Sequence, residues 1–365
     1  MVSPKSKKYK KTAKTATMMK IRKMKGYADR FLFTRYFTFR KFFNLLRIAY
    51  EYTAKKDVLK SRPCRLMIDT CNACVLKCPL CPTGKGEKGR TKAVMGFDDF
   101  RRVIDEVKDY LYEVDLYNWG EPLLNKDIFR MIEYAHKCDI KTKISTNLNY
   151  FPKDYEKRIV SSGLDSLMMS IDGASQETYQ VYRKGGDFRK VIGNIRKIVA
   201  EKKRQGSRKP LLIWQFIVMK HNEHELPKVK RMIKELGVDI LKVEAVRSDM
   251  GKEIFESDQQ KIEKSREWLP KDEKLSRFNY KNRQKKVRKR SCIFLWSMPV
   301  VNSNGSVSPC CSVYPEKFDF GNAFRDGLLK VWNNRFYTSS RRIVSGKEMK
   351  MFTVCAYCTK HGFIE

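Results

Sequence analysis

The feature of this sequence that most constrains its fold is an alternation of short β-rich runs with amphipathic helical segments between residues 66 and 246. Runs of β-branched and aromatic residues predict strands, whereas apolar residues recurring every three or four positions predict helices. Alternating strands and helices favour an α/β fold with parallel strands and helical crossovers. Six such units are too few for a complete eight-stranded barrel. The strands are expected at 66–70, 114–119, 141–146, 166–171, 211–219 and 239–246, and the helices at 97–110, 126–137, 153–162, 187–204 and 224–236.

Three cysteines follow the first predicted strand, on the loop that leaves it. Cys74, Cys78 and Cys81 are separated by three and then two residues. Three thiolates on one loop can hold three irons of a [4Fe–4S] cube and leave the fourth iron open to a small chelating molecule. The alternatives are a zinc site and a disulfide framework. Zinc sites usually carry two CxxC-type pairs, and disulfides are not expected in a long chain without a secretory signal.

This loop resembles the cluster motif of the radical S-adenosylmethionine (SAM) superfamily. The resemblance implies a partial (β/α)6 TIM-like barrel, a [4Fe–4S] cluster held by Cys74, Cys78 and Cys81, and SAM bound at the open iron. It also implies that the reduced cluster cleaves SAM to methionine and a 5′-deoxyadenosyl radical, which takes a hydrogen atom from the substrate. The cofactors supply that chemistry, while the protein supplies position and excludes water.

Polar signatures follow successive predicted strands, where the chemistry of a barrel is expected. Gly120 and Glu121 resemble the family motif whose backbone and acid hold the SAM amino group, and Gly120 would let the backbone approach the ligand. Arg183 resembles an arginine that pairs with the SAM carboxylate. Taken singly, these residues also fit a glycine turn, a helix cap or a surface arginine; their order after successive strands favours the SAM site. The residues assigned to SAM by the resemblance are Gly120, Glu121, Ser145, Asn147, Ser170, Asp172 and Arg183.

A second group of cysteines lies in residues 291–365. This region resembles the SPASM domain, with a Gly-x4-Cys hairpin at Gly305 and landmarks at Gly321-Asn322 and Trp332-Asn333. A full SPASM domain has seven cysteines and two clusters, whereas no cysteine follows Cys358 here. The resemblance therefore implies one fully ligated auxiliary [4Fe–4S] cluster, as in the shorter twitch variant of radical SAM cyclitol dehydrogenases. A four-thiolate zinc site is the alternative. The expected ligands are Cys292, Cys310, Cys355 and Cys358.

Two of the remaining cysteines carry specific expectations. Cys138 stands in a turn between a helix and a strand and is expected to be structural. Cys311 is a spare thiol next to a predicted ligand. Because neighbouring residues of a strand point to opposite faces, we expect Cys311 to face away from the barrel.

Residues 1–60 form a basic extension, with 18 Lys and Arg against three acids. The first 25 residues are lysine-rich and are expected to be disordered. Residues 31–50 predict an amphipathic helix rich in aromatic residues. Such a helix either lies on an anionic membrane surface or caps the barrel and buries its apolar side there. The second interpretation is favoured.

The sequence predicts four segments: the extension at 1–60, a radical SAM core at 61–246, a basic linker or insertion at 247–290 and a SPASM/twitch domain at 291–365. The third segment has seven Lys and Arg between residues 281 and 290. A charge run of this kind is usually a solvated face. The functional alternative is a phosphate-contacting patch near the mouth of the site.

Together these features predict a radical SAM oxidoreductase. A fully ligated auxiliary cluster cannot bind substrate through iron and is expected to accept or deliver an electron. Loss of a hydrogen atom and then an electron is a two-electron oxidation, so dehydrogenation of a sugar, aminosugar or cyclitol alcohol is favoured. Epimerisation and peptide maturation are alternatives within the superfamily. RNA modification and a basic zinc-binding nucleic-acid module are alternatives from other classes, although the sequence contains no recognised RNA-binding motif.

The composition indicates in which compartment the protein is located and which classes of partner it has. No apolar stretch approaches the ~20 residues needed to span a bilayer, and eleven cysteines suit a reducing compartment. A cytoplasmic location is therefore expected, with peripheral membrane contact through the basic N-terminus as a further option. The formal net charge of +36 would suit RNA, but without an RNA-binding motif a small-molecule or glycan-like substrate is expected instead, with an anionic one as an option. A reducing partner such as flavodoxin or ferredoxin is also expected, and nucleic acid is not favoured.

Overall fold

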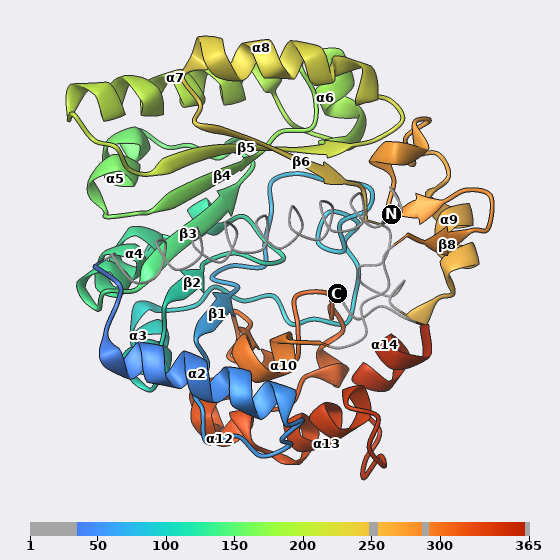
Figure 1. Ribbon diagram of the computed structural model, residues 1–365. Helices are drawn as coiled ribbons and strands as arrows, with labels where there is room; N and C mark the ends of the chain where they lie inside the picture. Colours follow the sequence, from blue (N-terminus) through green and yellow to red (C-terminus); the bar gives the residue numbers. More distant parts are fainter. Residues whose placement is uncertain (1–34, 248–254, 287–291, 362–365) are drawn as a thin grey trace, which may run out of the picture.

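The computed structural model describes residues 35–247, 255–286 and 292–361 (Figure 1). Within these residues the largest sheet has eight strands in the order β10-β9-β1-β2-β3-β4-β5-β6. Strands β1 to β6 are parallel neighbours in chain order. They are β1 (Arg65–Ile68), β2 (Glu113–Asp115), β3 (Lys141–Thr146), β4 (Ser166–Ser170), β5 (Leu211–Val218) and β6 (Ile240–Ala245).

Amphipathic helices connect the strands and cover the outer side of the curved sheet (Figure 1). Helix α7 is representative, because it buries Val191, Ile195 and Ile198 while its last turn carries three basic residues. Burial of such an apolar stripe, more than helix propensity, stabilises these helices. They are α3 (Phe97–Asp105), α4 (Ile128–Lys137), α5 (Tyr155–Ser161), α6 (Gln176–Tyr182), α7 (Phe188–Arg204) and α8 (Leu226–Leu236), with the 3-10 turns η1 (Pro122–Leu124) and η2 (Glu223–Glu225).

The predicted α/β fold with a partial (β/α)6 barrel is confirmed. Each of the six predicted strands and five predicted helices overlaps an observed one. Helix α6 was not predicted, although Ser175 is a good N-cap signal and its hydroxyl accepts a hydrogen bond from the Thr178 amide. Strand β2 is shorter than predicted because the chain leaves the sheet after Asp115.

Alternate strand residues face opposite sides of the sheet. Leu66 and Ile68 of β1 belong to the main core beneath the helices, whereas Met67 belongs to a separate buried cluster on the other side. That other side is the interior of the barrel. On β3, the partly exposed Lys143 and Ser145 alternate with buried neighbours. The interior is therefore partly polar and charged.

The C-terminal region is joined to the barrel through the same sheet. Strand β9 (Val300–Val301) runs parallel to β1, and β10 (Val307–Ser308) pairs antiparallel with β9. Strands of two residues carry no periodicity, so this continuation could not be read from the sequence. The accompanying helices are α10 (Phe294–Ser297), η5 (Glu316–Phe318), α11 (Ala323–Asp326), α12 (Leu328–Trp332), α13 (Arg335–Val344) and α14 (Cys355–His361).

The predicted linker or insertion at 247–290 contains regular structure in its described part. Its elements are α9 (Asp258–Ser265), η4 (Glu273–Leu275) and the short hairpin of β7 (Phe278–Asn279) and β8 (Gln284–Lys285). Three of the basic residues in the predicted charge run, Arg288, Lys289 and Arg290, lie outside the described residues.

Helix α2 (Phe39–Thr53) is amphipathic as predicted, but it buries only part of its apolar side: Ile48 is buried, and Leu45 and Tyr52 pack against the core. Its buried residues are Lys41, Asn44, Ile48 and Glu51. Four of its large apolar side chains point to solvent instead. The first 25 residues, expected to be disordered, lie outside the described residues.

The orientation of α2 follows from the partners of its polar side chains. The Lys41 ammonium donates to the Asp139 carbonyl oxygen over 2.7 Å. Asn44 exchanges two hydrogen bonds with the backbone of Arg62, and the Glu51 carboxylate accepts from the backbone of Ser61. These main-chain groups precede strands β1 and β3, so they fix α2 at the amino ends of the strands. Among the described residues, no helix combines the length and the hydropathy of a membrane span.

Candidate active site and cluster-binding residues

The cysteine loop, defined here as residues 71–95, leaves the carboxyl end of β1. Cys78 is buried, while Cys74 and Cys81 are partly buried. The Cys81 amide donates to the Cys78 carbonyl oxygen over 3.1 Å, so these two cysteines share one turn. Burial and, to a smaller extent, the charges of Glu121, Cys78 and Cys81 raise the pKa of Cys74 to about 12. The three predicted ligands therefore lie close enough to influence one another electrostatically.

Hydrogen-bond donors point at two of these sulfurs. The Leu76 amide and the Asn147 side-chain amide donate to Cys74 Sγ over 3.4 and 3.6 Å. The Arg183 guanidinium donates to Cys78 Sγ over 3.9 Å. Donors and a cation stabilise the thiolate form, although burial outweighs them and raises the pKa of both Cys74 and Cys78. The donor set therefore fits an iron–sulfur cluster held by thiolates at this loop.

Gly120 lies where the loop after β2 crosses the cysteine loop. A Cβ on Gly120 would lie 1.8 Å from the Cys71 carbonyl oxygen, so no side chain fits here. The next amide, of Glu121, donates to the Ala73 carbonyl oxygen over 2.8 Å. In this structure the close approach predicted for Gly120 is to the cysteine loop itself. The glycine fixes the distance between the two loops that carry the site.

The Glu121 carboxylate is turned into the protein and is 2% exposed. It accepts hydrogen bonds from the backbone amides of Asn147 and Leu123 over 2.8 and 3.1 Å. Burial raises the pKa of Glu121 to about 7, against the lowering effect of these hydrogen bonds. The acid thus links the loops after β2 and β3 and orients Asn147 toward Cys74.

The other predicted SAM contacts lie at the carboxyl ends of β3 and β4. The Ser145 and Ser170 hydroxyls are 3.1 Å apart, and both side chains are partly exposed toward the barrel interior. Asp172 is fully buried, and its carboxylate accepts from the Ile217 amide over 2.7 Å. These residues are brought together at one edge of the sheet, as the sequence predicted.

Arg183 lies between this edge and the cysteine loop. Its guanidinium donates to the Asp172 carboxylate through Nε and Nη2, both over 2.7 Å, and to Cys78 through Nη1. Burial lowers the pKa of Arg183 but the Asp172 charge raises it more, so that pKa lies well above its ordinary value. The cation that was predicted to bind the SAM carboxylate thus also holds Asp172 and faces a predicted cluster ligand.

Two buried charges near the site were missed by the sequence analysis. Arg90, on the cysteine loop, has no exposed side-chain surface and pairs with Asp319 of the C-terminal region at 2.9 Å. It also donates to the Tyr314 carbonyl oxygen over 2.6 Å. Asp69, at the end of β1, accepts from the Trp119 amide, and burial raises its pKa to about 7. Neither residue stands in a recognisable motif, so only the fold reveals them.

The second cysteine group comes together in the C-terminal region. Cys292, Cys310 and Cys358 pack against the core that contains the buried Cys355. Burial raises the pKa of Cys310, and the charges of Cys358 and Cys292 raise it further. The same two thiols act on Cys355 in the same direction. The four predicted ligands are thus neighbours although they span residues 292–358.

Gly305 forms the tight turn of the β9–β10 hairpin that carries Cys310. Its φ is +81°, and a Cβ there would lie 2.5 Å from the Phe324 ring. The Asn322 side chain caps α11 and also donates to the Asn304 carbonyl oxygen over 3.0 Å. The glycine and asparagine landmarks of the sequence therefore fold this hairpin against its neighbouring helix.

Cys311 does not face away from the barrel, as was expected from the sequence. Cys310 and Cys311 do pack into different clusters, but Cys311 contacts the cluster of Met67 and Val300 on the interior side of the sheet. The strand has already ended at Ser308, so strand alternation no longer determines which of the two thiols faces inward. Cys138 lies at the C-cap of α4, in the turn between helix and strand where it was predicted.

In the described part of the chain, no three His, Cys, Asp or Glu side chains converge as the ligands of one metal ion would. A four-iron cube differs from a single ion because each thiolate binds a different iron, so its ligands surround a larger body. The chemistry of both cysteine groups, with thiols as the candidate ligands, fits such cubes.

Comparison with known proteins agrees with this arrangement. The family model described as the radical SAM superfamily matches residues 68–233. The SPASM model, described as an iron–sulfur cluster-binding domain, matches residues 292–359. Together the two domains imply a catalytic [4Fe–4S] cluster, an auxiliary [4Fe–4S] cluster and SAM as cofactors.

Two curated relatives illustrate how far sequence similarity extends. An AdoMet-dependent heme synthase from Methanosarcina barkeri is 26% identical over 52% of this chain and 53% of that protein. A probable GTP 3′,8-cyclase from Methanocaldococcus jannaschii is 24% identical over 50% of this chain and 58% of that protein. The chain spans about half the length of the curated relatives it matches. Their names describe different reactions, so the similarity does not specify a substrate.

Solved structures extend the likeness over most of the chain. SuiB from Streptococcus suis, bound to S-adenosylmethionine, has a TM-score of 0.58 and 18% identity, covering 82% of this chain and 71% of that one. The protein anSMEcpe with bound AdoMet has a TM-score of 0.51 and 16% identity, covering 82% and 96%. At these identities the likeness shows the fold. Residues 68–233 of this chain are therefore a radical SAM domain, and residues 292–359 are a SPASM domain.

Proposed function

We propose that this enzyme oxidises an alcohol carbon of a small anionic sugar, aminosugar or cyclitol. The observation that carries the proposal is the gathering of four thiols, Cys292, Cys310, Cys355 and Cys358, in the C-terminal region. Four thiolates can occupy every iron of a cube, which leaves no iron for the substrate. A cluster of that kind suits electron transfer.

In the proposed site, Cys74, Cys78 and Cys81 hold the catalytic cluster. When bound, the two clusters and SAM supply hydrogen-atom abstraction and a one-electron acceptor, which are the two steps that oxidation of an alcohol requires. Asn147 and Arg183 stabilise the thiolates through the contacts to Cys74 and Cys78. Gly120 and Glu121 hold the loops at a fixed spacing, so that SAM is oriented against the barrel interior.

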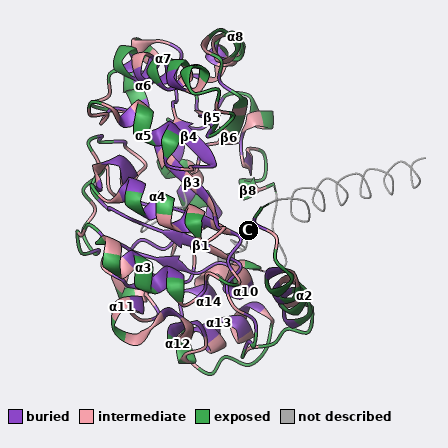
Figure 2. Cartoon of the chain, turned by 90° about the vertical axis from the view of Figure 1, so that its left-hand side faces the viewer, coloured by how far each residue is buried: buried purple, intermediate pink, exposed green. Residues whose placement is uncertain are grey.

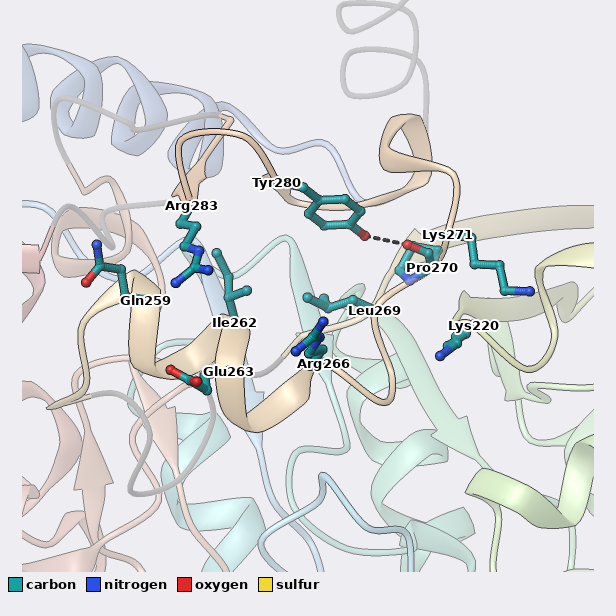
Figure 3. Close-up of a pocket in the computed structure, with 10 residues that line it drawn as sticks. All are labelled: Lys220, Gln259, Ile262, Glu263, Arg266, Leu269, Pro270, Lys271, Tyr280 and Arg283. Atoms are coloured by element: carbon teal, nitrogen blue, oxygen red, sulfur yellow. Dashed lines mark hydrogen bonds between the residues drawn. The ribbon is translucent and has the colours of Figure 1, made fainter.

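A basic pocket supports an anionic substrate. It has a volume of about 390 Å³ and is lined by Lys220, Arg266, Lys271 and Arg283 together with the single carboxylate of Glu263. Figure 3 shows Arg283 on one side of the space, Lys220 and Lys271 on the other, and Arg266 between them. A surplus of cations around a hollow favours a phosphate or carboxylate group.

The pocket adjoins the cysteine loop through shared packing. Its lining residue Leu269 belongs to the buried cluster that also contains Leu76 and Cys78. Lys220 lies just beyond β5, at the carboxyl edge of the sheet. An anionic group held in the pocket would therefore anchor a substrate on the same side of the barrel as the proposed site.

Epimerisation is the second candidate, because Cys311 packs on the interior side of the sheet. A substrate radical that is not oxidised must regain a hydrogen atom, and a thiol facing the interior could donate one. The Cys311→Ser variant separates the two reactions. Oxidation predicts that the variant retains both clusters and substantial product formation, whereas epimerisation predicts SAM cleavage without product.

The reaction is tested with the anaerobically reconstituted full chain, SAM, a reductant and anionic alcohols deuterated at the carbinol carbon. We expect deuterium in 5′-deoxyadenosine and one ketone formed for each SAM cleaved. Recovery of inverted substrate carrying hydrogen from solvent would instead support epimerisation. If a peptide is modified while every alcohol stays unlabelled and unchanged, the proposed substrate class is wrong.

The basic pocket is tested separately. In the double variant Lys220→Gln/Arg266→Gln, we expect KM for the anionic substrate to rise about tenfold or more, which corresponds to about 1.4 kcal/mol of lost binding. SAM cleavage without substrate should be unchanged. Arg196→Gln/Lys197→Gln, exposed on α7, is the control that removes the same charge elsewhere.

Flavodoxin or ferredoxin of a reducing compartment is the proposed electron donor.

A further inference from the structure

Helix α2 presents an apolar surface to solvent that the fold does not use. Its members are Phe39, Phe43, Leu46 and Tyr50, which are 73%, 63%, 51% and 62% exposed. Successive members are four, three and four residues apart, so they form one line along the helix. We call this line the aromatic stripe. Contiguous exposed apolar surface of this kind marks an interaction site.

The stripe is fixed in its outward position. The opposite side of α2 is held by the hydrogen bonds of Lys41, Asn44 and Glu51 to main-chain groups of the barrel. Rotating the helix to bury the stripe would break all of these bonds and leave buried polar groups unsatisfied. Figure 2 shows α2 at the outer edge of the molecule, with exposed residues along it.

A hollow lined by cations runs beside the stripe. It has a volume of about 620 Å³, and its basic lining residues are Arg40, Arg47, Lys60 and Arg62. We call it the basic hollow. Phe43 of the stripe also lines it, and its lining contains no Asp or Glu. Asp109 pairs with Arg40 from outside the lining, which leaves a surplus of positive charge. Such a hollow fits a phosphate-bearing group next to an apolar phase.

We propose that the aromatic stripe and the basic hollow dock the enzyme onto an anionic phospholipid surface. Aromatic side chains on one line would enter the boundary between headgroups and acyl chains, as in helices that lie in the membrane plane. The basic hollow would take a lipid headgroup. Residues 1–34, which precede α2 in the sequence, contain 11 Lys and Arg and one Asp. Their charge complements the same leaflet.

This docking would leave the active site free. Tyr36, which precedes α2, and Lys209 both donate hydrogen bonds to Asp165, just before β4. These contacts place the α2 side of the molecule at the amino ends of the strands. The cysteine loop leaves the carboxyl end of β1. Because the strands are parallel, the two features lie at opposite ends of the barrel. The proposal is therefore independent of the reaction, and a docked enzyme would still open toward solvent.

The test measures binding of the reconstituted full chain to two kinds of vesicle. One kind is phosphatidylcholine alone, and the other contains phosphatidylserine as well. We expect salt-sensitive binding to the anionic vesicles only. Each basic side chain near an anionic surface strengthens binding about fivefold. The hollow variant Arg47→Gln/Lys60→Gln should therefore weaken binding at least tenfold. The stripe variant Phe39→Ala/Phe43→Ala/Tyr50→Ala should weaken it as much.

Matched variants keep the test decisive. Arg196→Gln/Lys197→Gln on α7 removes two exposed charges, and Phe352→Ala removes an exposed aromatic ring; neither should change vesicle binding. Unchanged SAM cleavage shows that each variant is folded. A chain lacking residues 1–34 should bind more weakly but remain sensitive to the stripe variant.

Three outcomes would overturn the proposal. The first is vesicle binding that neither the stripe nor the hollow variant alters, which would assign binding to residues 1–34. The second is absence of binding to anionic vesicles. The third is a dimer in solution that the stripe variant converts to a monomer without any effect on vesicles, which would assign the stripe to a second copy of the chain.

Discussion

Both ends of the barrel bury polar side chains, at one end to assemble the candidate site and at the other to anchor α2. At the carboxyl end, Glu121 and Asp172 are buried and Arg183 is partly buried against loops that bring the cysteines and the SAM motifs together. At the amino end, Lys41 and Glu51 are buried against main-chain groups, and the aromatic side of α2 faces solvent. Polarity alone thus does not decide which side of an element is buried. The decisive factor is whether the fold offers a partner for each buried polar group.

The largest expected effect concerns the carboxyl end. Replacing Cys74, Cys78 and Cys81 together by alanine removes three proposed covalent bonds to iron that no neighbour replaces. We expect the variant to retain only the auxiliary iron and to lose SAM cleavage. Iron analysis and a SAM cleavage assay measure this. The matched control replaces Cys64, Cys71 and Cys138, none of which is a predicted ligand, by alanine and should retain both clusters. SAM cleavage by the Cys74/Cys78/Cys81 variant would refute the assignment.

The next effect concerns the link from the cysteine loop to the C-terminal region. In Arg90→Met, the carboxylate of Asp319 loses its buried partner. Breaking such a pair costs about 3–5 kcal/mol. We expect the free energy of unfolding in urea to fall by that amount. Arg90→Met/Asp319→Leu removes both charges and should recover much of the loss. A cost below about 1 kcal/mol for the single variant would show that the pair does not fasten the two regions.

A smaller effect at the same end tests Arg183. A charge-assisted hydrogen bond to the SAM carboxylate contributes about 1.5–3 kcal/mol. We expect Arg183→Ala in an Asp172→Asn background to raise the dissociation constant of SAM about tenfold or more. The Asp172→Asn background is needed because Arg183→Ala alone would leave the buried Asp172 carboxylate without its ion-pair partner. Asp172→Asn alone is the control. Equal SAM affinity in the single and double variants would mean that Arg183 serves only the loop and Cys78.

At the amino end, Glu51→Ala removes the acceptor of the Lys60 and Ser61 amides. An unsatisfied buried donor costs about 1–3 kcal/mol, so the free energy of unfolding should fall within that range. Glu51→Gln keeps an acceptor oxygen and should recover part of the loss. If alanine is tolerated without cost, polar anchoring does not explain the orientation of α2.

The smallest expected effect is at Phe43, on the exposed side of the same helix. Phe43→Ala should change the free energy of unfolding by less than about 0.5 kcal/mol, because the side chain packs on no core. Phe100→Ala, at a fully buried position of α3, should cost about 3–5 kcal/mol. Similar costs at the two positions would show that the stripe is covered within the folded chain.

Six strands and five of the helices could be predicted from the sequence, because their periodicities are local. The sequence also determined the three-cysteine motif, since Cys74, Cys78 and Cys81 lie within eight residues of one loop. The SAM motifs could be expected to lie together, because each follows a parallel strand and the carboxyl ends of parallel strands share one edge of a sheet. These features need only short-range pattern and topology.

The remaining features depend on contacts between parts of the chain that are distant in sequence. The Arg90–Asp319 pair joins residues that are far apart in the chain. The pairing of β9 with β1 could not be predicted, because a strand of two residues has no recognisable sequence pattern. The inward position of Cys311 depends on where β10 ends. The outward aromatic side of α2 depends on main-chain partners at Asp139 and Ser61. Each depends on groups that become neighbours only on folding, where hydrogen bonds to buried polar groups outweigh local apolar pattern.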